Sequence, residues 1–305
     1  MNGKPSLPEI IEVQEYFGLP SPALVEKDWY VMRALAATLA AVTAPFRLIF
    51  GGGTALSRAH RLLQRMSEDI DLKIISDEPM TRPALRRLRE AITQSLLDAG
   101  FAFDPKNAKY RESRNEGRYT IYQLPYTPVA APAATLRPEI QIETAVWPLR
   151  QASVTLPVSS FIAEAYQRGP EIPAVECISL SEATAEKFVA LTRRAGALFA
   201  DAGGPRDPAL VRHVYDLHIM SAHNNPAAVI SMAREIMLAD VEAYGHQFPA
   251  YREDPVRETV HASRRMATEP DFERQYEIFV RDMVYGETVG FAEAIKTISI
   301  LAGRL

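Results

Sequence analysis

The chain has 305 residues, enough for one large domain or two small ones, and its 47% hydrophobic and 24% charged residues are typical of globular proteins. The net charge of −4 excludes a global basic field, so a nucleic-acid partner would need a local patch. A single cysteine, Cys177, excludes an intrachain disulfide framework and a multi-cysteine zinc site. Neither a signal peptide nor an 18-residue apolar run is found, so we expect a soluble cytoplasmic protein without a membrane span.

Helix caps and apolar periodicity predict the elements in chain order. The expected helices of the N-terminal half cover residues 8–17, 22–41, 54–64, 82–99 and 160–167. The expected strands cover residues 46–50, 69–75, 119–124, 137–146, 152–158 and 175–178. Beyond them, the expected helices cover residues 180–199, 208–222, 226–244, 256–267, 271–284 and 288–302. The pattern therefore predicts an α/β half, residues 1–175, followed by an all-α half, residues 176–305.

The most informative stretch is an apolar strand that ends in Gly51-Gly52-Gly53 and is followed, one helix later, by Asp69 and Asp71 on a second strand. Because strand side chains alternate, both acids leave one face, with Cα atoms about 6.5–7 Å apart. Glycines let the backbone approach phosphate oxygens, and the N-terminus of the next helix favours an anion. Carboxylates are the oxygen ligands that Mg²⁺ prefers. The stretch therefore predicts a Mg²⁺–triphosphate site, although the Walker A and dinucleotide-binding patterns are both absent.

A third carboxylate would complete a two-metal site and could deprotonate an attacking hydroxyl. Glu139, Gln141 and Glu143 share one face of the expected 137–146 strand. We prefer Glu143 as the third acid and keep Glu139 as the alternative. The competing interpretation is that these side chains form a solvent-facing polar edge.

Charged residues among apolar neighbours form a second set of candidates. Lys187 and Asp216 lie in apolar helical contexts, and burying either would be costly without phosphate, metal or an opposite charge as partner. Glu26-Lys27-Asp28 opens the second helix beside two aromatic residues. That cluster is either a solvated first turn or a support for the site.

These motifs together carry a resemblance to a known family. Residues 51–56 followed by residues 65–72 resemble the first motif of the AbiEii/AbiGii toxin family of nucleotidyltransferases. That family belongs to the polymerase-β-type superfamily and includes the MenT toxins. Further similar motifs are the N-terminal helix motif at 26–30, the third-carboxylate strand at 137–143, the helical lysine at 187 and the Asp-Leu motif at 215–217.

The resemblance implies an α+β nucleotidyltransferase fold, with a mixed sheet flanked by helices and followed by an all-α half. It implies catalytic roles for Asp69, Asp71, Glu143, Lys187 and Asp216, the first three also as metal ligands. Lys187 would contact the triphosphate with support from Asp216, and the nearby arginines Arg58, Arg61 and Arg65 would help to orient the triphosphate. The nucleotide-binding residues would be Gly52, Gly53, Thr54, Arg65, Ser67 and Lys187.

The activity implied is transfer of NMP from an NTP to an acceptor with Mg²⁺ or Mn²⁺ as cofactor. The family further implies a tRNA 3′ end as acceptor, a toxin role in phage defence, and an antitoxin with a helix-turn-helix domain. A tRNA would need a basic path, which the arginines at 82–89, 193–194 and 264–265 could supply. Rival hypotheses are nucleotidylation of a protein target and a non-catalytic nucleotide-binding protein of the same fold.

The chain departs from the superfamily pattern at two places. Where the superfamily has Gly-Ser at the turn, this chain has Gly-Gly-Thr, so a hydroxyl for the phosphate must come from Thr54 or Ser67. Residues 202–208 are rich in glycine and proline, which suggests an insertion between the lysine and Asp-Leu motifs.

Overall fold

The computed structural model describes residues 3–133, 136–200 and 207–305. The chain divides into two compact units, residues 1–178 and residues 179–305, and each is described by itself below. No helix in the described ranges is both long and apolar enough to cross a membrane.

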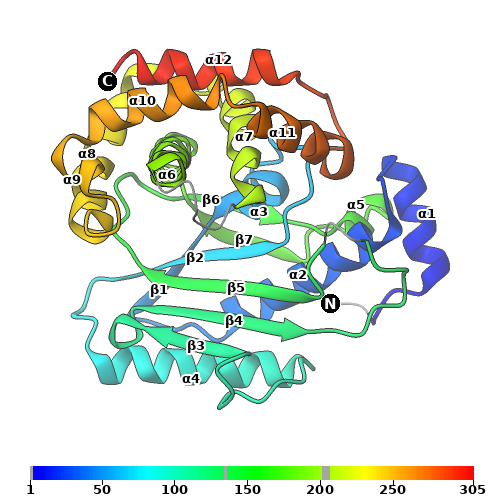
Figure 1. Ribbon diagram of the computed structural model, residues 1–305. Coiled ribbons are helices and arrows are strands. Elements are labelled where there is room, and N and C mark those ends of the chain that lie inside the picture. The colour runs from blue at the N-terminus through cyan, green and yellow to red at the C-terminus, as the bar shows by residue number, and fades with distance from the viewer. Residues whose placement is uncertain (1–2, 134–135, 201–206) are drawn as a thin grey trace. The chain divides into compact units, whose positions relative to one another are not determined.

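The first unit is built on a seven-stranded mixed sheet (Figure 1). Its strands are β1 (Phe46–Gly51), β2 (Asp69–Ser76), β3 (Arg111–Arg114), β4 (Tyr119–Pro125), β5 (Glu139–Val146), β6 (Val154–Val158) and β7 (Ile172–Cys177). Their order in the sheet is β3-β4-β5-β2-β1-β7-β6. β2 pairs in parallel with β5 and antiparallel with β1. The strand that carries both aspartates is therefore central in the sheet.

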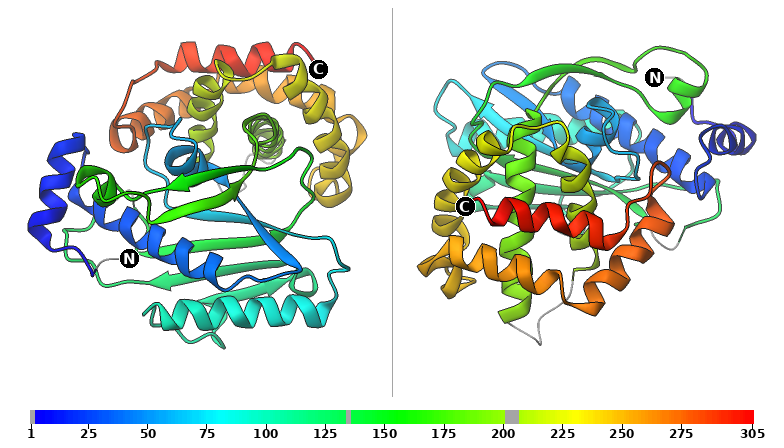
Figure 2. Two further views of the ribbon diagram at one scale, coloured as in Figure 1. Left: turned by 180° about the vertical axis from the view of Figure 1, so that it is seen from behind. Right: turned by 90° about the horizontal axis from the view of Figure 1, so that it is seen from above.

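The first unit also contains helices and short helical turns. They include α1 (Leu7–Phe17), α2 (Pro22–Ala40), α3 (Gly52–Thr54), the π-helix η1 (Ala55–Ala59), α4 (Arg82–Asp98), the 3₁₀ turn η2 (Asn115–Gly117) and α5 (Phe161–Ala165). α2 and α4 pack on the same face (Figures 1 and 2), where Ile70 and Leu72 of β2 and Ile140 and Ile142 of β5 enter the core. Because strand side chains alternate, the acids of β2 and β5 leave the opposite face.

The second unit is helical. Its elements are α6 (Leu180–Ala200), η3 (Pro208–Val211), α7 (Arg212–Ser221), α8 (Pro226–Tyr244), α9 (Pro249–Glu253), α10 (Pro255–Met266), α11 (Pro270–Met283) and α12 (Phe291–Ala302). α6 is central and contacts α7, α8 and α10 (Figure 1, where α6 is seen end-on). The Ser179 side chain caps the N-terminus of α6, since its hydroxyl accepts the Glu182 N–H at 3.2 Å. The expected α+β fold with a helical C-terminal part is thus confirmed.

Three elements differ from expectation. The helix expected over 54–64 ends at Ala59, and Arg61 adopts a left-handed φ of 53°. β3 was not expected, because its sequence Arg-Glu-Ser-Arg has no apolar residue to reveal alternation. The five-residue helix α9 was also missed. The suggested insertion at 202–208 lies largely outside the described residues.

The charged cluster of α2 is buried, which contradicts a solvated first turn. Glu26, Lys27 and Asp28 are 1%, 0% and 2% exposed. The Glu26 carboxylate accepts the backbone N–H groups of Val129 and Ala130 at 2.9–3.0 Å. Glu26 therefore fixes the loop between β4 and β5.

Lys27 fixes the start of β5 against the segment that leads into β2. Its ammonium donates to the carbonyl oxygens of Arg137 at 2.7 Å and Glu139 at 2.6 Å, and it lies 3.2 Å from the Glu68 carboxylate. Glu68 is also buried, and it accepts the Arg137 backbone N–H at 3.0 Å. One buried cation thus joins the residues that precede the acids on both strands.

Asp28 fixes a third segment. Its carboxylate accepts the Phe161 N–H at 2.7 Å and lies 3.2 Å from the Arg58 guanidinium. Burial raises the pKa of Asp28 to about 6, while Arg58 and the Phe161 N–H act in the opposite direction. The carboxylate is therefore ionised at neutral pH and ties α5 and the π-helix to α2.

We expect Lys27→Met to lower the free energy of unfolding by about 3–5 kcal/mol, because it leaves the Glu68 charge buried without its ammonium partner. Adding Glu68→Gln should recover part of the loss, since the buried charge is then removed. As control, Arg86→Met breaks the exposed pair with Glu90 and should cost less than about 1 kcal/mol. Urea unfolding measures all three, and equal costs for Lys27→Met and Arg86→Met would contradict the assignment.

Candidate active site

The glycine turn and Asp71 are in direct contact. β1 ends at Gly51, whose register partner on β2 is Asp71. Gly52 follows with a left-handed φ of +68°, and a Cβ built at this position would overlap the Asp71 carboxylate. Only glycine fits both the backbone conformation and the space at Gly52.

Two polar side chains lie against the next glycine. A Cβ on Gly53 would come within 2.6 Å of both Arg65 Nη2 and Ser67 Oγ. Thr54 is fully buried, and its hydroxyl donates to the backbone carbonyl of Asp69. Of the two hydroxyls expected to reach a phosphate, the Thr54 hydroxyl is thus bound to the backbone, whereas Ser67 is half-buried beside the turn.

Asp69 and Asp71 project from the same face of β2, as expected from alternation. Both are half-buried, while Ile70 and Leu72 between and after them are buried. In the parallel pairing with β5, Asp71 is opposite Glu143 and Asp69 is opposite Gln141. Neighbouring strands lie about 4.8 Å apart, so Asp71 and Glu143 are side by side.

The register separates the two candidates for the third acid. Glu139 stands at the start of β5, two residues before Gln141, which is the first β5 residue paired with β2. Its partner is Pro125 of β4. The position opposite Asp71 belongs to Glu143, in line with the preference stated from sequence.

Hydrogen bonds orient the Glu143 side chain. Its Oε1 accepts from Gln141 Nε2 at 2.7 Å, and its Oε2 accepts from the Tyr119 hydroxyl at 3.0 Å. Burial and the neighbouring Glu143 carboxylate raise the pKa of Tyr119, so this hydroxyl stays protonated. Tyr119 and Gln141 thereby fix the Glu143 side chain as a hydrogen-bond acceptor on the open face of the sheet.

Arg137 lies in the candidate site, although the sequence analysis gave this residue no role. Its Nη2 donates to Asp69 Oδ1 and Oδ2 at 2.5 and 2.6 Å, and its Nη1 donates to Gln141 Oε1 at 2.6 Å. Burial opposes its charge, but Asp69 and Glu68 raise the pKa of Arg137 above its ordinary value. The residue lies within the motif at 137–143, yet only the strand register shows that it reaches Asp69.

The three acids suit a divalent cation by type and position. All are carboxylates on one face of two hydrogen-bonded strands, which is the oxygen-rich donor set that Mg²⁺ or Mn²⁺ favours. Within residues 3–133, 136–200 and 207–305, however, no three Asp, Glu, His or Cys side chains converge as a metal-binding group. The side chains of Asp69 and Glu143 are directed to the neutralising and donor groups described above.

The second unit carries the other two predicted catalytic residues, and they form an ion pair. Lys187 Nζ of α6 lies 2.9 Å from Asp216 Oδ2 of α7. Asp216 is fully buried and Lys187 is 9% exposed. The expectation that each would need an opposite charge in its apolar surroundings is met, because each is the partner of the other.

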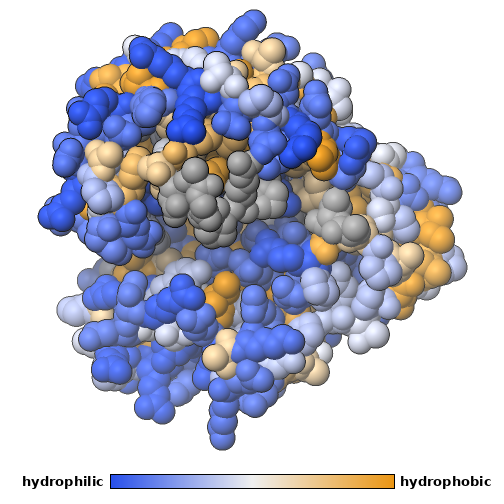
Figure 3. Space-filling view, viewed as in Figure 1, coloured by the Kyte–Doolittle hydropathy of each residue, from blue (hydrophilic) through white to orange (hydrophobic). Residues whose placement is uncertain are grey.

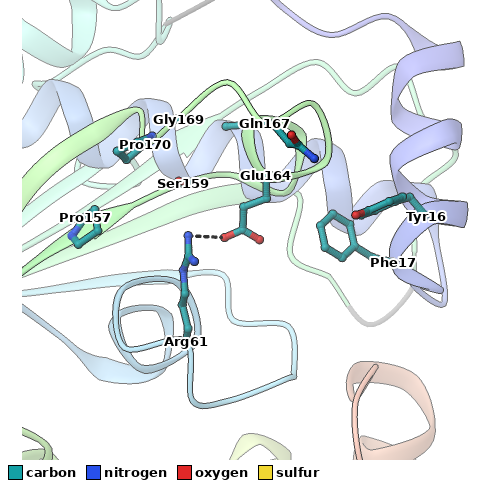
Figure 4. Close-up of a pocket in the computed structure, with 10 residues that line it drawn as sticks. Tyr16, Phe17, Arg61, Pro157, Ser159, Glu164, Gln167, Gly169 and Pro170 are labelled. Carbon is teal, nitrogen blue, oxygen red and sulfur yellow. Dashed lines mark ion pairs between the residues drawn. The ribbon is translucent and has the colours of Figure 1, made fainter.

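One pocket of the first unit contains none of the acids or glycines predicted for the site. It has a volume of about 490 Å³ and includes Arg61, whose guanidinium lies 3.4 Å from Glu164 (Figure 4). Arg58 is also directed to Glu164, at 3.5 Å, and to Asp28. These two arginines, expected from sequence to orient a triphosphate, are instead occupied by carboxylates of the first unit.

We expect Gly52→Ala to destabilise the protein by more than Gly18→Ala. Both glycines have a left-handed φ, but the space around Gly18 is open, whereas a Cβ on Gly52 overlaps Asp71. The conformational cost should be about 1 kcal/mol in both variants, and the overlap should add about 1–3 kcal/mol at Gly52. Asp71→Ala in the Gly52→Ala background should recover the added part. Equal unfolding free energies for the two single variants would refute the contact.

Similar proteins are found among solved structures and among protein families. No curated protein matches the sequence. Among solved structures, MenT4, a nucleotidyltransferase toxin from Mycobacterium tuberculosis H37Rv, matches with a TM-score of 0.57 and 18% identity. The match covers 97% of this chain and 90% of that chain, so the two share a fold.

The family model described as "Nucleotidyl transferase AbiEii toxin, Type IV TA system" matches residues 33–297. This range includes the glycine turn, the acids of β2 and β5, and the Lys187–Asp216 pair. The resemblance inferred from the motifs is confirmed. The chain belongs to the AbiEii family of nucleotidyltransferase toxins of type IV toxin–antitoxin systems.

Proposed function

We propose that the open face of β2 and β5 is the catalytic centre of this nucleotidyltransferase and transfers NMP from an NTP to an acceptor hydroxyl. The observation that carries the proposal is the register that sets Asp71 beside Glu143 while Asp71 contacts the glycine turn. The acids that would bind a metal ion and the turn that would bind phosphate therefore lie next to each other.

Mg²⁺ or Mn²⁺ would be held by Asp69, Asp71 and Glu143, and it would neutralise the charge that develops on the phosphates. The turn at Gly52 and Gly53, with Thr54, Arg65 and Ser67 next to it, would bind the triphosphate. Ser67 is the better candidate for a side-chain hydroxyl on phosphate, because the Thr54 hydroxyl is bound to the backbone.

In the proposed reaction, the acceptor hydroxyl oxygen attacks the α-phosphorus in line with the bond to the β-phosphate oxygen. The new O–P bond forms as the old one breaks, pyrophosphate leaves, and Glu143 accepts the hydroxyl proton. Tyr119 and Gln141 keep Glu143 oriented for this task. Lys187, supported by Asp216, is proposed to contact the triphosphate.

We propose a tRNA 3′ end as the acceptor, supported by a local basic surface. Residues 82–118 contain nine Lys or Arg against five Asp or Glu, a net charge of +4 in a chain of net charge −4. α4 packs beside the β3–β4 hairpin, and Figure 3 shows predominantly hydrophilic side chains over this region. The exposed basic residues of the surface are Arg82, Arg86, Arg87, Lys106, Lys109, Arg114 and Arg118.

Arg118 joins the basic surface to β5, whereas α4 packs on the face of the sheet opposite to the acids. The Arg118 carbonyl accepts the Val146 N–H at the end of β5, and the next residue, Tyr119, donates to Glu143. At about 3.3 Å per residue, Val146 lies about 10 Å along the strand from Glu143. Arg86 of this surface is paired with Glu90 and Arg114 with Glu112, as Arg193 is with Asp240 and Arg194 with Asp207 in the second unit. The excess of positive charge at residues 82–118 is what favours the first unit as support for a phosphate backbone.

Membership of a type IV toxin family implies an antitoxin partner and an NTP substrate. We further propose that the antitoxin carries a helix-turn-helix domain, that the pair acts in phage defence, and that the toxin works in the cytoplasm. The single free cysteine, Cys177, fits a reducing compartment.

We expect Asp69→Asn, Asp71→Asn and Glu143→Gln each to lower transfer of label from α-labelled NTP to total tRNA on the order of 10³-fold, because each removes a charge at the reacting phosphate. The matched control is Asp77→Asn, the same change on an exposed residue just after β2, which should keep wild-type activity. Label recovered on protein and not on tRNA would refute tRNA as the acceptor. Full activity of Asp69→Asn would refute the proposed catalytic site.

We expect Arg82→Gln/Arg87→Gln/Arg118→Gln to weaken tRNA binding at least about 10-fold at 0.1 M salt. The slope of log affinity against log salt should fall by about 2–3, as expected for three lost phosphate contacts. NTP binding should be unchanged. The control with equal charge change neutralises three exposed arginines of the second unit, Arg257, Arg274 and Arg281. Equal effects of the two triple variants would contradict the basic surface.

A further inference from the structure

Arg137 stands where a cation bound to Asp69 would stand. One guanidinium nitrogen donates to both Asp69 oxygens, at 2.5 and 2.6 Å, and so occupies the space between them. A divalent ion binds carboxylate oxygens at about 2.0–2.2 Å, and it would meet a like charge in the same place. In this arrangement the guanidinium and a divalent ion cannot both hold Asp69.

The main chain of Arg137 is held in place, whereas its guanidinium group can change its hydrogen-bond partner. Its backbone N–H donates to Glu68 and its carbonyl accepts from Lys27, so both backbone groups are anchored by a buried ion pair. Pro138 follows and restricts the backbone further. The side chain, in contrast, is 36% exposed, and Asp69 is 29% exposed. The guanidinium can therefore change partner without any movement of the strands.

Gln141 defines where the guanidinium can go. Its Oε1 accepts from Arg137 Nη1, and its Nε2 donates to Glu143. Gln141 thus links the arginine to the third acid along one row of the sheet face. A triphosphate bound at the glycine turn would bring several negative charges to this row and would offer the guanidinium a bidentate partner in place of Asp69.

We propose that Arg137 is a resident counter-ion of Asp69: its guanidinium excludes a divalent cation from the nucleotide-free site and releases Asp69 only when metal and nucleotide bind together. The inference rests on the proposed function of this face and adds a residue that determines what the site accepts. Arg137 then couples the two ligands, because the triphosphate that accepts the guanidinium also brings the metal. Such coupling is reciprocal: the nucleotide raises metal affinity by the same factor as the metal raises nucleotide affinity.

The test is a titration of the nucleotide-free full chain with Mn²⁺. The electron paramagnetic resonance signal of the free ion measures how much Mn²⁺ remains unbound. Arg137→Gln should bind Mn²⁺ at least about 10-fold more tightly than wild type, because the competing cation is gone. Arg47→Gln removes the same charge from an exposed position on the same unit and should change the affinity less than about 3-fold. Arg137→Lys keeps the charge and should stay close to wild type.

A second measurement follows the coupling. Mn²⁺ affinity measured with and without a non-hydrolysable NTP should differ by a larger factor in wild type than in Arg137→Gln. Asp69→Asn in the Arg137→Gln background should abolish the tight Mn²⁺ site, which assigns the ion to Asp69. Thermal unfolding of each variant confirms that it is folded, and if Arg137→Gln does not fold, Arg137→Ala is used in its place.

The outcomes separate this proposal from the proposed function. Equal Mn²⁺ affinity in Arg137→Gln and Arg47→Gln, or weaker binding in Arg137→Gln than in wild type, would overturn the counter-ion role. If the wild-type protein transfers labelled NMP while either of these results is found, the proposed nucleotidyltransferase site is still supported. Tighter Mn²⁺ binding in Arg137→Gln without any label transfer would support the counter-ion and refute the proposed transfer reaction.

Discussion

The first unit depends on one buried ammonium. Lys27 of α2 is fully buried, and it binds the carbonyl oxygens of Arg137 and Glu139 as well as the carboxylate of Glu68. Glu68 immediately precedes Asp69, the first residue of β2, and Arg137 lies two residues before Glu139, the first residue of the β5 strand that carries Glu143. A single cation therefore sets where both strands begin. Because a slip of one residue would send every strand side chain to the other face, this anchor also sets which acids meet.

The cost of burying such charges explains why they come as a connected set. An isolated buried ammonium or carboxylate is strongly unfavourable, but Lys27 and Glu68 each have an opposite charge and additional hydrogen bonds. The set continues through Arg137 to Asp69 and through Gln141 to Glu143. Structural and proposed catalytic charges thus form one network, in which the buried end positions the groups on the open face.

Local sequence signals were sufficient for most helices and strands and for the shared face of Asp69 and Asp71. Ser21 and Thr81 cap α2 and α4 as serine and threonine commonly do, and alternation identified β2. Alternation also put Asp69 and Asp71 on one face. Signals of this kind fail where tertiary partners decide: the segment after Gly53 forms a π-helix, with Arg58 and His60 bound to Ser159 and Ile178 from other parts of the unit.

The contacts that complete the site could not be predicted from sequence. Arg137 and Asp69 are 68 residues apart, and only the parallel register of β2 with β5 brings them together. The same register distinguishes Glu143 from Glu139, which alternation alone leaves equivalent. The buried state of Glu26-Lys27-Asp28 was also ambiguous, because a run of charged residues in a first helical turn is usually solvated.

The central claim is that the face shared by β2 and β5 binds the metal and the nucleotide together. It is tested most directly by a crystal structure with Mn²⁺ and a non-hydrolysable NTP, using anomalous scattering to locate the ion. The account predicts an anomalous peak between Asp71 and Glu143, a triphosphate on the turn at Gly52 and Gly53, and an Arg137 guanidinium that has left Asp69. A nucleotide bound elsewhere, or an ion that does not contact these acids, would contradict it.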